Sequence, residues 1–387
     1  MQKNQHTKNS KKTFFLTGGG TGGHIYPCVS ILNELKNRGE DNIFYVGNSK
    51  NPEYDVVLPL GVKFLDVPVF GMPRKISPKF IKWVILLFIS ILKCIYYALK
   101  FKPDVVFATG GYVCAPMVIV SKIFKIPYVM HDSDAHPGIV TRAFASGAKY
   151  VNLAFLEGNK FIKSKNITNY KNPVRNEFFT VSAADAKAKM GVNPQEFCVL
   201  IMGGSQGAKT INNAAIGLIG QYLNNENIKI IFQTGKKNFD EVKKYLKDRL
   251  NLDFDDNNDV IGRKNLIIRP YFDMMYLPIL ASDVVVSRAG SLSISEILAA
   301  KKPSILVPYP YAAADHQRKN AKEVEKTGAA VYIEDKDLNS EILGKILDDF
   351  MKDGAALQAM GENAGRQIIE NPTYKILDLI LDAASNG

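Results

Sequence analysis

Residues 13–37, TFFLTGGGTGGHIYPCVSILNELKN, form the stretch that decides the fold. A short apolar run, Thr13–Thr17, enters the loop Gly18–Gly23, in which five of the six residues are glycine. A helical stretch, Tyr26–Asn37, follows, and a second strand is expected at Ile43–Val46. A strand, a glycine loop and a helix in this order begin a βαβ unit, and the glycines allow a phosphate or sugar to approach the helix N-terminus.

The loop matches a dinucleotide-binding pattern only in part. Gly18, Gly20 and Gly23 fit GxGxxG, but a dinucleotide enzyme also needs an acidic residue after the second strand to hold the ribose. That strand ends in Gly47-Asn48-Ser49, so we do not expect NAD. His24 directly follows the loop and is a candidate general base near neutral pH. The alternative is a helix residue that only packs.

The second half of the chain repeats the pattern. A strand, Phe197–Met202, leads into the small-residue turn Gly203–Ala208 and a helix, Ile211–Leu223. Strands that alternate with helices predict an α/β fold of two Rossmann-like, doubly wound domains, whose glycine loops face a cleft. Further strands are expected at Val105–Ala108, Tyr128–His131, Ile228–Gln233, Leu266–Ile268, Asp283–Val286 and Ser304–Val307.

The domain boundaries follow from composition. Residues 1–12 are polar and basic, with no apolar stretch of a signal peptide, and we expect a disordered tail. The Pro-containing, polar segment Asn172–Val181 is typical of a linker. We therefore expect domains at 13–174 and 175–368. A C-terminal helix within 369–387 is expected to pack back on the first domain.

Charge and cysteine content exclude several classes of protein. Of the net charge of +11, residues 1–175 hold 24 Lys+Arg against 10 Asp+Glu (+14), and residues 176–387 hold 25 against 28 (−3). A basic half suits an anionic membrane surface or nucleic acid, but no nucleic-acid motif accompanies it, so we expect no nucleic-acid partner. The four cysteines form no CxxC pair and the five histidines form no metal-spaced cluster, so we expect reduced thiols and no metal site.

An apolar helix within residues 76–102 supports the membrane alternative. Its stretch without charges, Trp83–Leu92, has ten residues, whereas a spanning helix needs about 20. It is either an amphipathic helix buried in the α/β domain or a helix with one face in the headgroup layer, and both hold if one face packs inward. The predicted membrane face comprises Trp83, Phe88, Ile91 and Ile95 with the flanking cations Lys82 and Lys93.

The segment Val284–Glu296, VVVSRAGSLSISE, is a candidate diphosphate site. A buried strand leads to Gly290, and a helix is expected to begin at Ser291. Exposed N–H groups at this helix start suit a diphosphate, and Glu296, one turn further on, suits both ribose hydroxyls. The alternative is an ordinary capped helix, since Ser is a common N-cap.

Together these segments resemble the MurG family of peripheral-membrane glycosyltransferases, from about Phe14 to Ala383. The family adds N-acetylglucosamine to undecaprenyl-diphosphate-MurNAc-pentapeptide (lipid I) and has the GT-B fold of two Rossmann-like domains. The motifs are TGGGTGGHIYP (Thr17–Pro27), ATGGYVCAP (Ala108–Pro116), HDSDAHPG (His131–Gly138), NPVR (Asn172–Arg175), MGGSQGA (Met202–Ala208), SRAGSLSISE (Ser287–Glu296) and DHQRKNA (Asp315–Ala321).

The resemblance implies roles for individual residues. The first domain would bind acceptor and membrane, and the second the nucleotide sugar. His24 would be the catalytic base, and Tyr112 and Asp132 would lie on the acceptor side. UDP-N-acetylglucosamine would be held by Thr21, Gly22, Gly23, Asp134, Arg175, Ser205, Phe272, Ser291, Leu292, Ser293, Glu296 and Gln317.

Two residues depart from the family pattern. Asp132 and Asp134 stand where the family usually has Glu and Asn, and an ionised carboxylate cannot donate a hydrogen bond as an amide does. The same residues spell DxD, a metal signature of another glycosyltransferase fold, which we interpret as coincidence.

The resemblance also implies partners and a location. The partners would be UDP-N-acetylglucosamine, a polyprenyl-diphosphate-linked acceptor and the cytoplasmic face of the bacterial membrane. We expect no cofactor and no protein metal site, although a divalent cation could stimulate transfer. The alternatives are a transferase with another acceptor or donor sugar, a GT-B sugar-nucleotide epimerase, and an inactive membrane scaffold.

Overall fold

The computed structural model describes residues 11–73, 75, 77–204, 206–255, 260–312 and 315–385. The chain forms two compact units. Unit 1 runs to Ser133, resumes at Pro137–Pro173 and includes the C-terminal segment from Pro372; unit 2 comprises Asp134–His136 and Val174–Asn371. Residues 1–10, most of the predicted tail, lie outside the described part.

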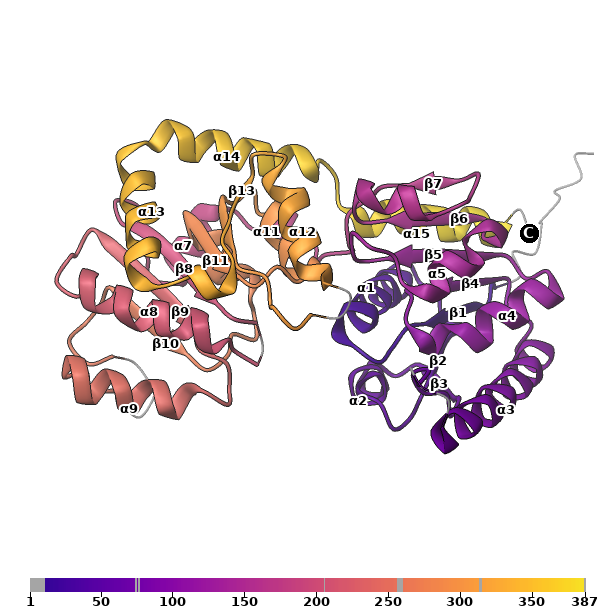
Figure 1. Cartoon of the computed structure of the whole chain (residues 1–387). Helices are drawn as coiled ribbons and strands as arrows, with labels where there is room; N and C mark the ends of the chain where they lie inside the picture. Colours follow the sequence, from indigo (N-terminus) through magenta and orange to yellow (C-terminus); the bar gives the residue numbers. More distant parts are fainter. Residues whose placement is uncertain are drawn as a thin grey trace, which may run out of the picture. The chain divides into compact units, whose positions relative to one another are not determined.

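Unit 1 is built on a parallel sheet of strand order β3-β2-β1-β4-β5-β6-β7, covered by helices (Figure 1). Because β1 pairs with both β2 and β4, the strand order reverses beside β1 and the sheet is doubly wound. The strands are β1 (Phe14–Thr17), β2 (Ile43–Gly47), β3 (Lys63–Asp66), β4 (Val105–Ala108), β5 (Tyr128–Asp132), β6 (Tyr150–Leu153) and β7 (Ile167–Thr168). The helices are α1 (Gly22–Asn37), α2 (Pro52–Val57), α3 (Pro78–Phe101), α4 (Ala115–Phe124), α5 (Ile139–Phe144) and α15 (Pro372–Ser385), with 3-10 turns η1 (Leu58–Leu60), η2 (Tyr112–Cys114), η3 (Ala145–Gly147) and η4 (Leu156–Phe161).

The apolar pattern of the first βα segment explains its burial. All four residues of β1 are buried, as expected for a central parallel strand covered on both faces. In α1 the buried side chains recur at helical spacing, and Gly39 ends the segment with a left-handed φ of +82°. The C-terminal helix α15 belongs to the same core, where Ile376 and Ile380 join Leu16.

Unit 2 repeats this plan with a parallel sheet of order β10-β9-β8-β11-β12-β13, which reverses beside β8. Two doubly wound parallel sheets confirm the predicted fold class. The strands are β8 (Phe197–Met202), β9 (Ile228–Gln233), β10 (Leu266–Arg269), β11 (Val284–Ser287), β12 (Ser304–Leu306) and β13 (Ala330–Tyr332). The helices are α6 (Glu177–Thr180), α7 (Ala183–Lys189), α8 (Lys209–Tyr222), α9 (Phe239–Leu250), α10 (Tyr276–Ala281), α11 (Ser291–Ala299), α12 (His316–Glu325), α13 (Ser340–Lys352) and α14 (Gly354–Gln367), with the 3-10 turn η6 (Asp335–Asp337).

The segment Asn172–Val181, expected to link the two domains, contains buried and hydrogen-bonded residues. Asn172 is fully buried, and its side-chain oxygen lies 2.9 Å from Nε2 of His131. Val174 and Phe178 are also buried, and α6 forms within the segment. Its Pro and polar residues therefore serve local packing and hydrogen bonding. The change from unit 1 to unit 2 occurs between Pro173 and Val174.

Candidate active site

The glycine loop of unit 1 connects the carboxyl end of β1 to α1 and places His24 in the first turn of that helix. Nδ1 of His24 lies 3.0 Å from Oγ1 of Thr21, so a residue of the loop itself contacts the ring. The backbone passes close to its surroundings: a Cβ atom on Gly18 would lie 1.9 Å from Oγ1 of Thr109. Only glycine therefore fits at position 18.

A second glycine pair, Gly110-Gly111, follows the adjacent strand β4 and lies against His24. Both glycines have a left-handed φ, +85° and +74°. A Cβ atom on Gly111 would lie 3.1 Å from Nδ1 of His24 and 2.9 Å from the carbonyl oxygen of Gly19. Two glycine loops at the carboxyl ends of β1 and β4 thus enclose His24 where the strand order reverses. This is the edge at which open parallel sheets bind ligands.

Asp132 ends β5, the next strand of the sheet, and it is 2% exposed. Its Oδ2 accepts hydrogen bonds from the backbone N–H of Gly138 (2.9 Å) and the hydroxyl of Thr141 (2.6 Å). A Cβ atom on Gly110 would lie 3.6 Å from the same oxygen. Asp132 and His24 therefore both border Gly110, and Asp132 also holds the loop that begins α5.

Tyr112 also joins this group. It begins η2, and its hydroxyl accepts a hydrogen bond of 3.1 Å from Nδ2 of Asn51. A Cβ atom on Gly20 would lie 2.9 Å from the Tyr112 ring, and burial raises the pKa of its phenol. The structure thus brings the predicted acceptor-side residues and His24 together within unit 1.

In unit 2 the predicted diphosphate site begins α11 directly after β11. Gly290 is the N-cap residue and makes no side-chain cap bond, so the backbone N–H groups of the first turn are not capped by it. The positive end of the helix dipole favours an anion at this position. Ser291, Leu292 and Ser293 form this first turn, as the sequence predicts.

Glu296 lies on the following turn of α11 and is partly buried. Desolvation raises its pKa to about 7, and the positive charge of Arg175 opposes this rise. Arg175 donates a hydrogen bond of 3.3 Å to the carbonyl oxygen of Asp273, beside Phe272. Glu296 and Arg175 are therefore electrostatically coupled within unit 2.

Gln233, at the end of β9, holds the loop of Phe272 against the small-residue turn after β8. Its Oε1 accepts the N–H of Phe272 at 3.0 Å, and its Nε2 donates to the carbonyl of Gly204 at 3.3 Å. Ser205, the next residue after Gly204, is predicted to bind the donor and lies outside the described residues.

Asp134 and Gln317 lie near the start of α12. Asp134 accepts a hydrogen bond of 3.0 Å from Nδ2 of the fully buried Asn320, whose Oδ1 accepts the N–H of Ala135 at 2.9 Å. Gln317 accepts the N–H of Tyr309 at 2.9 Å. The carboxylate of Asp134 is thus anchored to unit 2, whereas Asp132 is anchored within unit 1.

Among the described residues no three His, Cys, Asp or Glu side chains gather to hold a metal ion.

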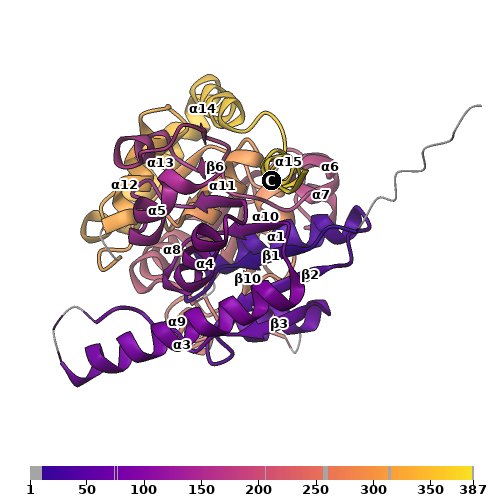
Figure 2. The same ribbon diagram turned by 90° about the vertical axis from the view of Figure 1, so that its right-hand side faces the viewer.

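Helix α3 presents one face to its unit and leaves the other exposed. Ser90, Cys94 and Ala98 are buried, and α3 packs against α4. The amino-terminal half projects beyond the sheet of unit 1 (Figure 2). By length and composition alone α3 could cross a membrane, although its packed face makes it a layer of unit 1. The exposed apolar side chains of α3 are Ile81, Val84, Ile85, Phe88, Ile89, Leu92, Tyr96 and Leu99.

This exposed stripe corrects the predicted membrane face in part. Phe88 is 61% exposed and Lys82 is exposed, whereas Ile91 and Ile95 pack against the core. Lys93 forms an ion pair of 2.8 Å with Asp66. The error arose because the core-facing residues of α3 are as apolar as the exposed ones, so composition does not separate the two faces.

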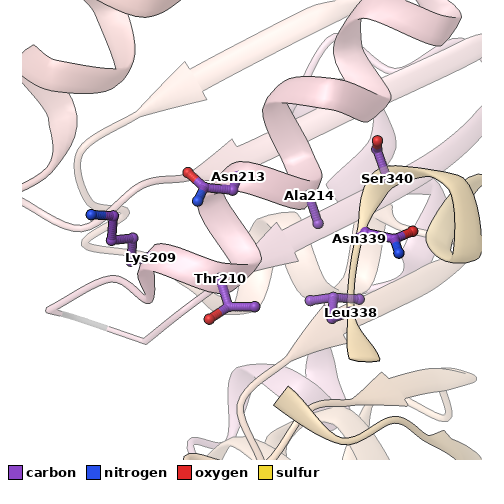
Figure 3. A pocket seen from close by; sticks show the side chains of 7 residues that line it. All are labelled: Lys209, Thr210, Asn213, Ala214, Leu338, Asn339 and Ser340. Atoms are coloured by element: carbon purple, nitrogen blue, oxygen red, sulfur yellow. The ribbon is translucent and has the colours of Figure 1, made fainter. Parts of the chain in front are cut away.

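A cavity of about 360 Å³ lies between α8 and the start of α13 (Figure 3). None of the predicted site residues lines it. Its walls are formed by Lys209, Thr210, Asn213, Ala214, Leu338, Asn339 and Ser340.

Sequence reasoning missed the buried polar residues that support the loops. Glu53, Gln233 and Asn320 are at most 1% exposed, and each bonds a loop that carries predicted site residues. Gln233 directly precedes a Thr-Gly turn, and Asn320 belongs to the motif DHQRKNA (Asp315–Ala321), in which only Gln317 was given a role. Glu53 follows no pattern that separates it from a surface residue.

Comparisons with known proteins agree with this architecture. Residues 14–152 match the glycosyltransferase family 28 N-terminal domain, and residues 198–379 match the glycosyltransferase family 28 C-terminal domain. The crystal structure of Acinetobacter baumannii MurG superimposes with a TM-score of 0.76 at 23% identity, covering 96% of this chain and 99% of that one. At this identity the likeness shows the fold.

Two full-length relatives are more similar in sequence. Proteins of Halothermothrix orenii and Carboxydothermus hydrogenoformans are 34% and 35% identical to this chain. The alignments cover 96% and 95% of this chain and 99% and 96% of those proteins. Both are named UDP-N-acetylglucosamine--N-acetylmuramyl-(pentapeptide) pyrophosphoryl-undecaprenol N-acetylglucosamine transferase.

Proposed function

The chain belongs to glycosyltransferase family 28, and from this premise we propose that it transfers N-acetylglucosamine from UDP-N-acetylglucosamine to the 4-hydroxyl of MurNAc in lipid I, which gives lipid II. This reaction is a step of peptidoglycan synthesis and hence of cell-wall biogenesis, cell shape and division. Both domain types are present in one chain, and relatives aligned over almost their whole length bear the name of this transferase. The site observation that carries the proposal is His24 between two glycine loops at the reversal point of the sheet.

Unit 2 binds the donor in this proposal. The first turn of α11 receives the diphosphate, where the helix dipole and the N–H groups of Ser291–Ser293 stabilise the charge that develops on UDP as it leaves. Glu296 accepts hydrogen bonds from the ribose hydroxyls, Arg175 and Phe272 contact the nucleotide, and Gln317 contacts the sugar. The remaining residues expected on the donor side are Asp134 and Ser205 of unit 2 and Thr21, Gly22 and Gly23 of unit 1.

His24 acts as the general base on the acceptor. When Nδ1 donates its hydrogen to Thr21, Nε2 carries the lone pair that takes the proton of the attacking hydroxyl. The acceptor oxygen forms a bond to C1 of N-acetylglucosamine while the bond from C1 to the β-phosphate oxygen breaks. UDP leaves with that electron pair, and the anomeric configuration inverts.

The carboxylate of Asp134 favours a second candidate function, in which the donor sugar or the acceptor differs. Asp134 presents a carboxylate where the family has an amide, and Asn320 holds it in place. An ionised carboxylate accepts but does not donate, so the sugar hydroxyls it favours differ from those an amide favours. A transferase that prefers another UDP-sugar or another lipid-linked acceptor is the alternative. Competition of UDP-glucose and UDP-N-acetylgalactosamine with labelled UDP-N-acetylglucosamine distinguishes the two.

Unit 1 docks on the cytoplasmic face of the bacterial membrane in the same proposal. The exposed stripe of α3 provides apolar area for the acyl boundary, and Lys82 and Lys100 are exposed beside it. Basic side chains near such a surface add about 1 kcal/mol each on anionic lipid. This places the acceptor side of unit 1 next to a lipid-linked substrate.

The experiment that tests the proposal is transfer by purified protein with labelled UDP-N-acetylglucosamine and a lipid I analogue. The expected products are the glycosylated lipid and one UDP per transferred sugar. Binding of UDP-N-acetylglucosamine without transfer to lipid I would move the acceptor or sugar assignment to the alternative. Failure to bind any uridine nucleotide would overturn the proposal.

A further inference from the structure

Glu53 is a fully buried carboxylate directly beneath the glycine loop. It lies in the first turn of α2, and its side chain is 0% exposed. Oε2 accepts the backbone N–H of Gly20 at 3.0 Å. A Cβ atom on Gly19 would lie 2.5 Å from the carboxyl carbon and from Oε1, so the loop rests on this group.

The other carboxylate oxygen binds the segment after β2. Oε1 accepts the backbone N–H of Asn48 at 3.2 Å and Nδ2 of Asn51 at 3.1 Å. Three N–H donors therefore converge on two oxygens. An amide at position 53 would direct its own NH₂ at one of these donors, whichever way it is turned. The site thus requires an acceptor on both sides, which among side chains of this length only a carboxylate provides.

Asn51 extends this arrangement to the acceptor side. The NH₂ group that donates to Glu53 also donates to the hydroxyl of Tyr112 at 3.1 Å. The ring of Tyr112 in turn lies against Gly20, where a Cβ atom would come within 2.9 Å of it. Glu53, Gly20, Tyr112 and Asn51 form a closed circuit of contacts. Movement of any member changes the position of the glycine loop that precedes His24.

We propose that Glu53 is a positioning residue of the transfer reaction, which fixes the glycine loop and Tyr112 for the acceptor. Its bond to Gly20 turns this N–H inward and holds the left-handed φ of +83°. Thr21 and His24 follow immediately, so the base is placed by a carboxylate that touches no substrate. This role rests on the proposed function, because it concerns the acceptor of that reaction.

The test is steady-state transfer by the full chain carrying Glu53→Gln. We expect kcat/KM for a lipid I analogue to fall tenfold or more, while the dissociation constant of UDP-N-acetylglucosamine, measured by calorimetry, rises by a smaller factor, because most of the proposed donor contacts lie in unit 2. Asp104→Asn is the matched control. Its carboxylate also accepts a backbone N–H, that of Thr13 at 2.7 Å. This bond lies at the amino-terminal ends of β1 and β4, away from the glycine loops at their carboxyl ends. We expect wild-type values for both constants in this control.

A second set of variants does not depend on the folding of Glu53→Gln. Asn51→Ala and Tyr112→Phe each remove the bond between these two side chains and leave Glu53 bonded to Gly20. In a double-mutant cycle their effects on acceptor kcat/KM are expected to be non-additive, because the two changes break the same contact. Additive effects would contradict the circuit.

The outcomes separate the two proposals. The positioning role would be overturned if Glu53→Gln had wild-type acceptor kinetics, or if it lost donor affinity and acceptor kcat/KM by the same factor. The proposed function would still stand in either case, as long as the wild type transfers the sugar. Absence of transfer by the wild type would overturn the proposed function and this role with it.

Discussion

The affinity for UDP-N-acetylglucosamine should depend on pH through Glu296. Burial raises the pKa of this carboxyl to about 7, so it changes charge close to neutral pH. Ribose hydroxyls donate hydrogen bonds, and only the ionised carboxylate accepts from both of them. The ionised fraction is about 10/11 at pH 8 and about 1/11 at pH 6. The apparent dissociation constant scales inversely with the binding-competent fraction. It should therefore rise about tenfold when the pH is lowered from 8 to 6.

The variant Glu296→Gln removes the titration and keeps the shape. A hydrogen bond to a charged group contributes about 1.5–3 kcal/mol, so at pH 8 the variant should bind roughly 10- to 150-fold more weakly. Its affinity should not change between pH 6 and pH 8. The assay is calorimetry with UDP-N-acetylglucosamine rather than UDP, because its diphosphate diester does not titrate in this range. A flat wild-type profile, or a variant with the wild-type slope, would refute the assignment of Glu296 to the ribose.

The same pKa has a consequence for stability. The folded-state pKa lies above the unfolded value of 4.5, so folding favours the protonated form. The free energy of unfolding should therefore fall as the pH rises from 4.5 to 7, by at most about 3 kcal/mol at about 1.4 kcal/mol per unit. Glu296→Gln should be more stable than the wild type at pH 8 and should lose this advantage at pH 4.5. Denaturant titrations at the two pH values test this expectation.

Three further variants test other parts of the account. His24→Ala should lower kcat by about 10²–10⁴-fold, because it removes the general base, without changing the donor dissociation constant; a loss below threefold would exclude His24 as the base. Gly111→Ala should reduce both stability and transfer, because its Cβ would lie 2.9 Å from the Gly19 carbonyl at a φ of +74°. Gly354→Ala, which meets no atom within 4 Å, is its control, and equal behaviour of the two would contradict the packing argument. Phe88→Ser should reduce binding to anionic vesicles at an unchanged melting temperature, whereas Ile91→Ser should lower the melting temperature; the reverse result would exchange the two faces of α3.

Much of the fold could be predicted from local patterns. The strands β4, β8 and β9 have the predicted bounds, because central parallel strands are continuous apolar runs bounded by turns. The strands β3, β6, β7 and β13 were not predicted. Only one of the four residues of β3 is buried, and β7 has only two residues, so neither shows the continuous apolar run of a central strand. Asp283 was predicted within a strand but lies before β11, where it accepts the N–H of Cys198 at 2.8 Å.

In the candidate site, too, local sequence predicts some residues and not others. Glycine loops and the residues beside them could be found, because tight turns and helix starts impose local composition. Supporting residues such as Glu53 could not be found, because its bond to Gly20 joins residues that are 33 positions apart and meet only in the folded unit. The two faces of α3 were not separated for a similar reason, since tertiary packing alone distinguishes Ile91 from Phe88.

Transfer by the full chain is the most direct test of the central claim. In the presence of anionic vesicles containing a lipid I analogue, labelled N-acetylglucosamine should appear on the lipid, in equal amount to released UDP and with inverted anomeric configuration. Loss of this product in His24→Ala, with donor binding retained, would complete the predicted result. Release of UDP without label on the lipid, or retained anomeric configuration, would contradict the account.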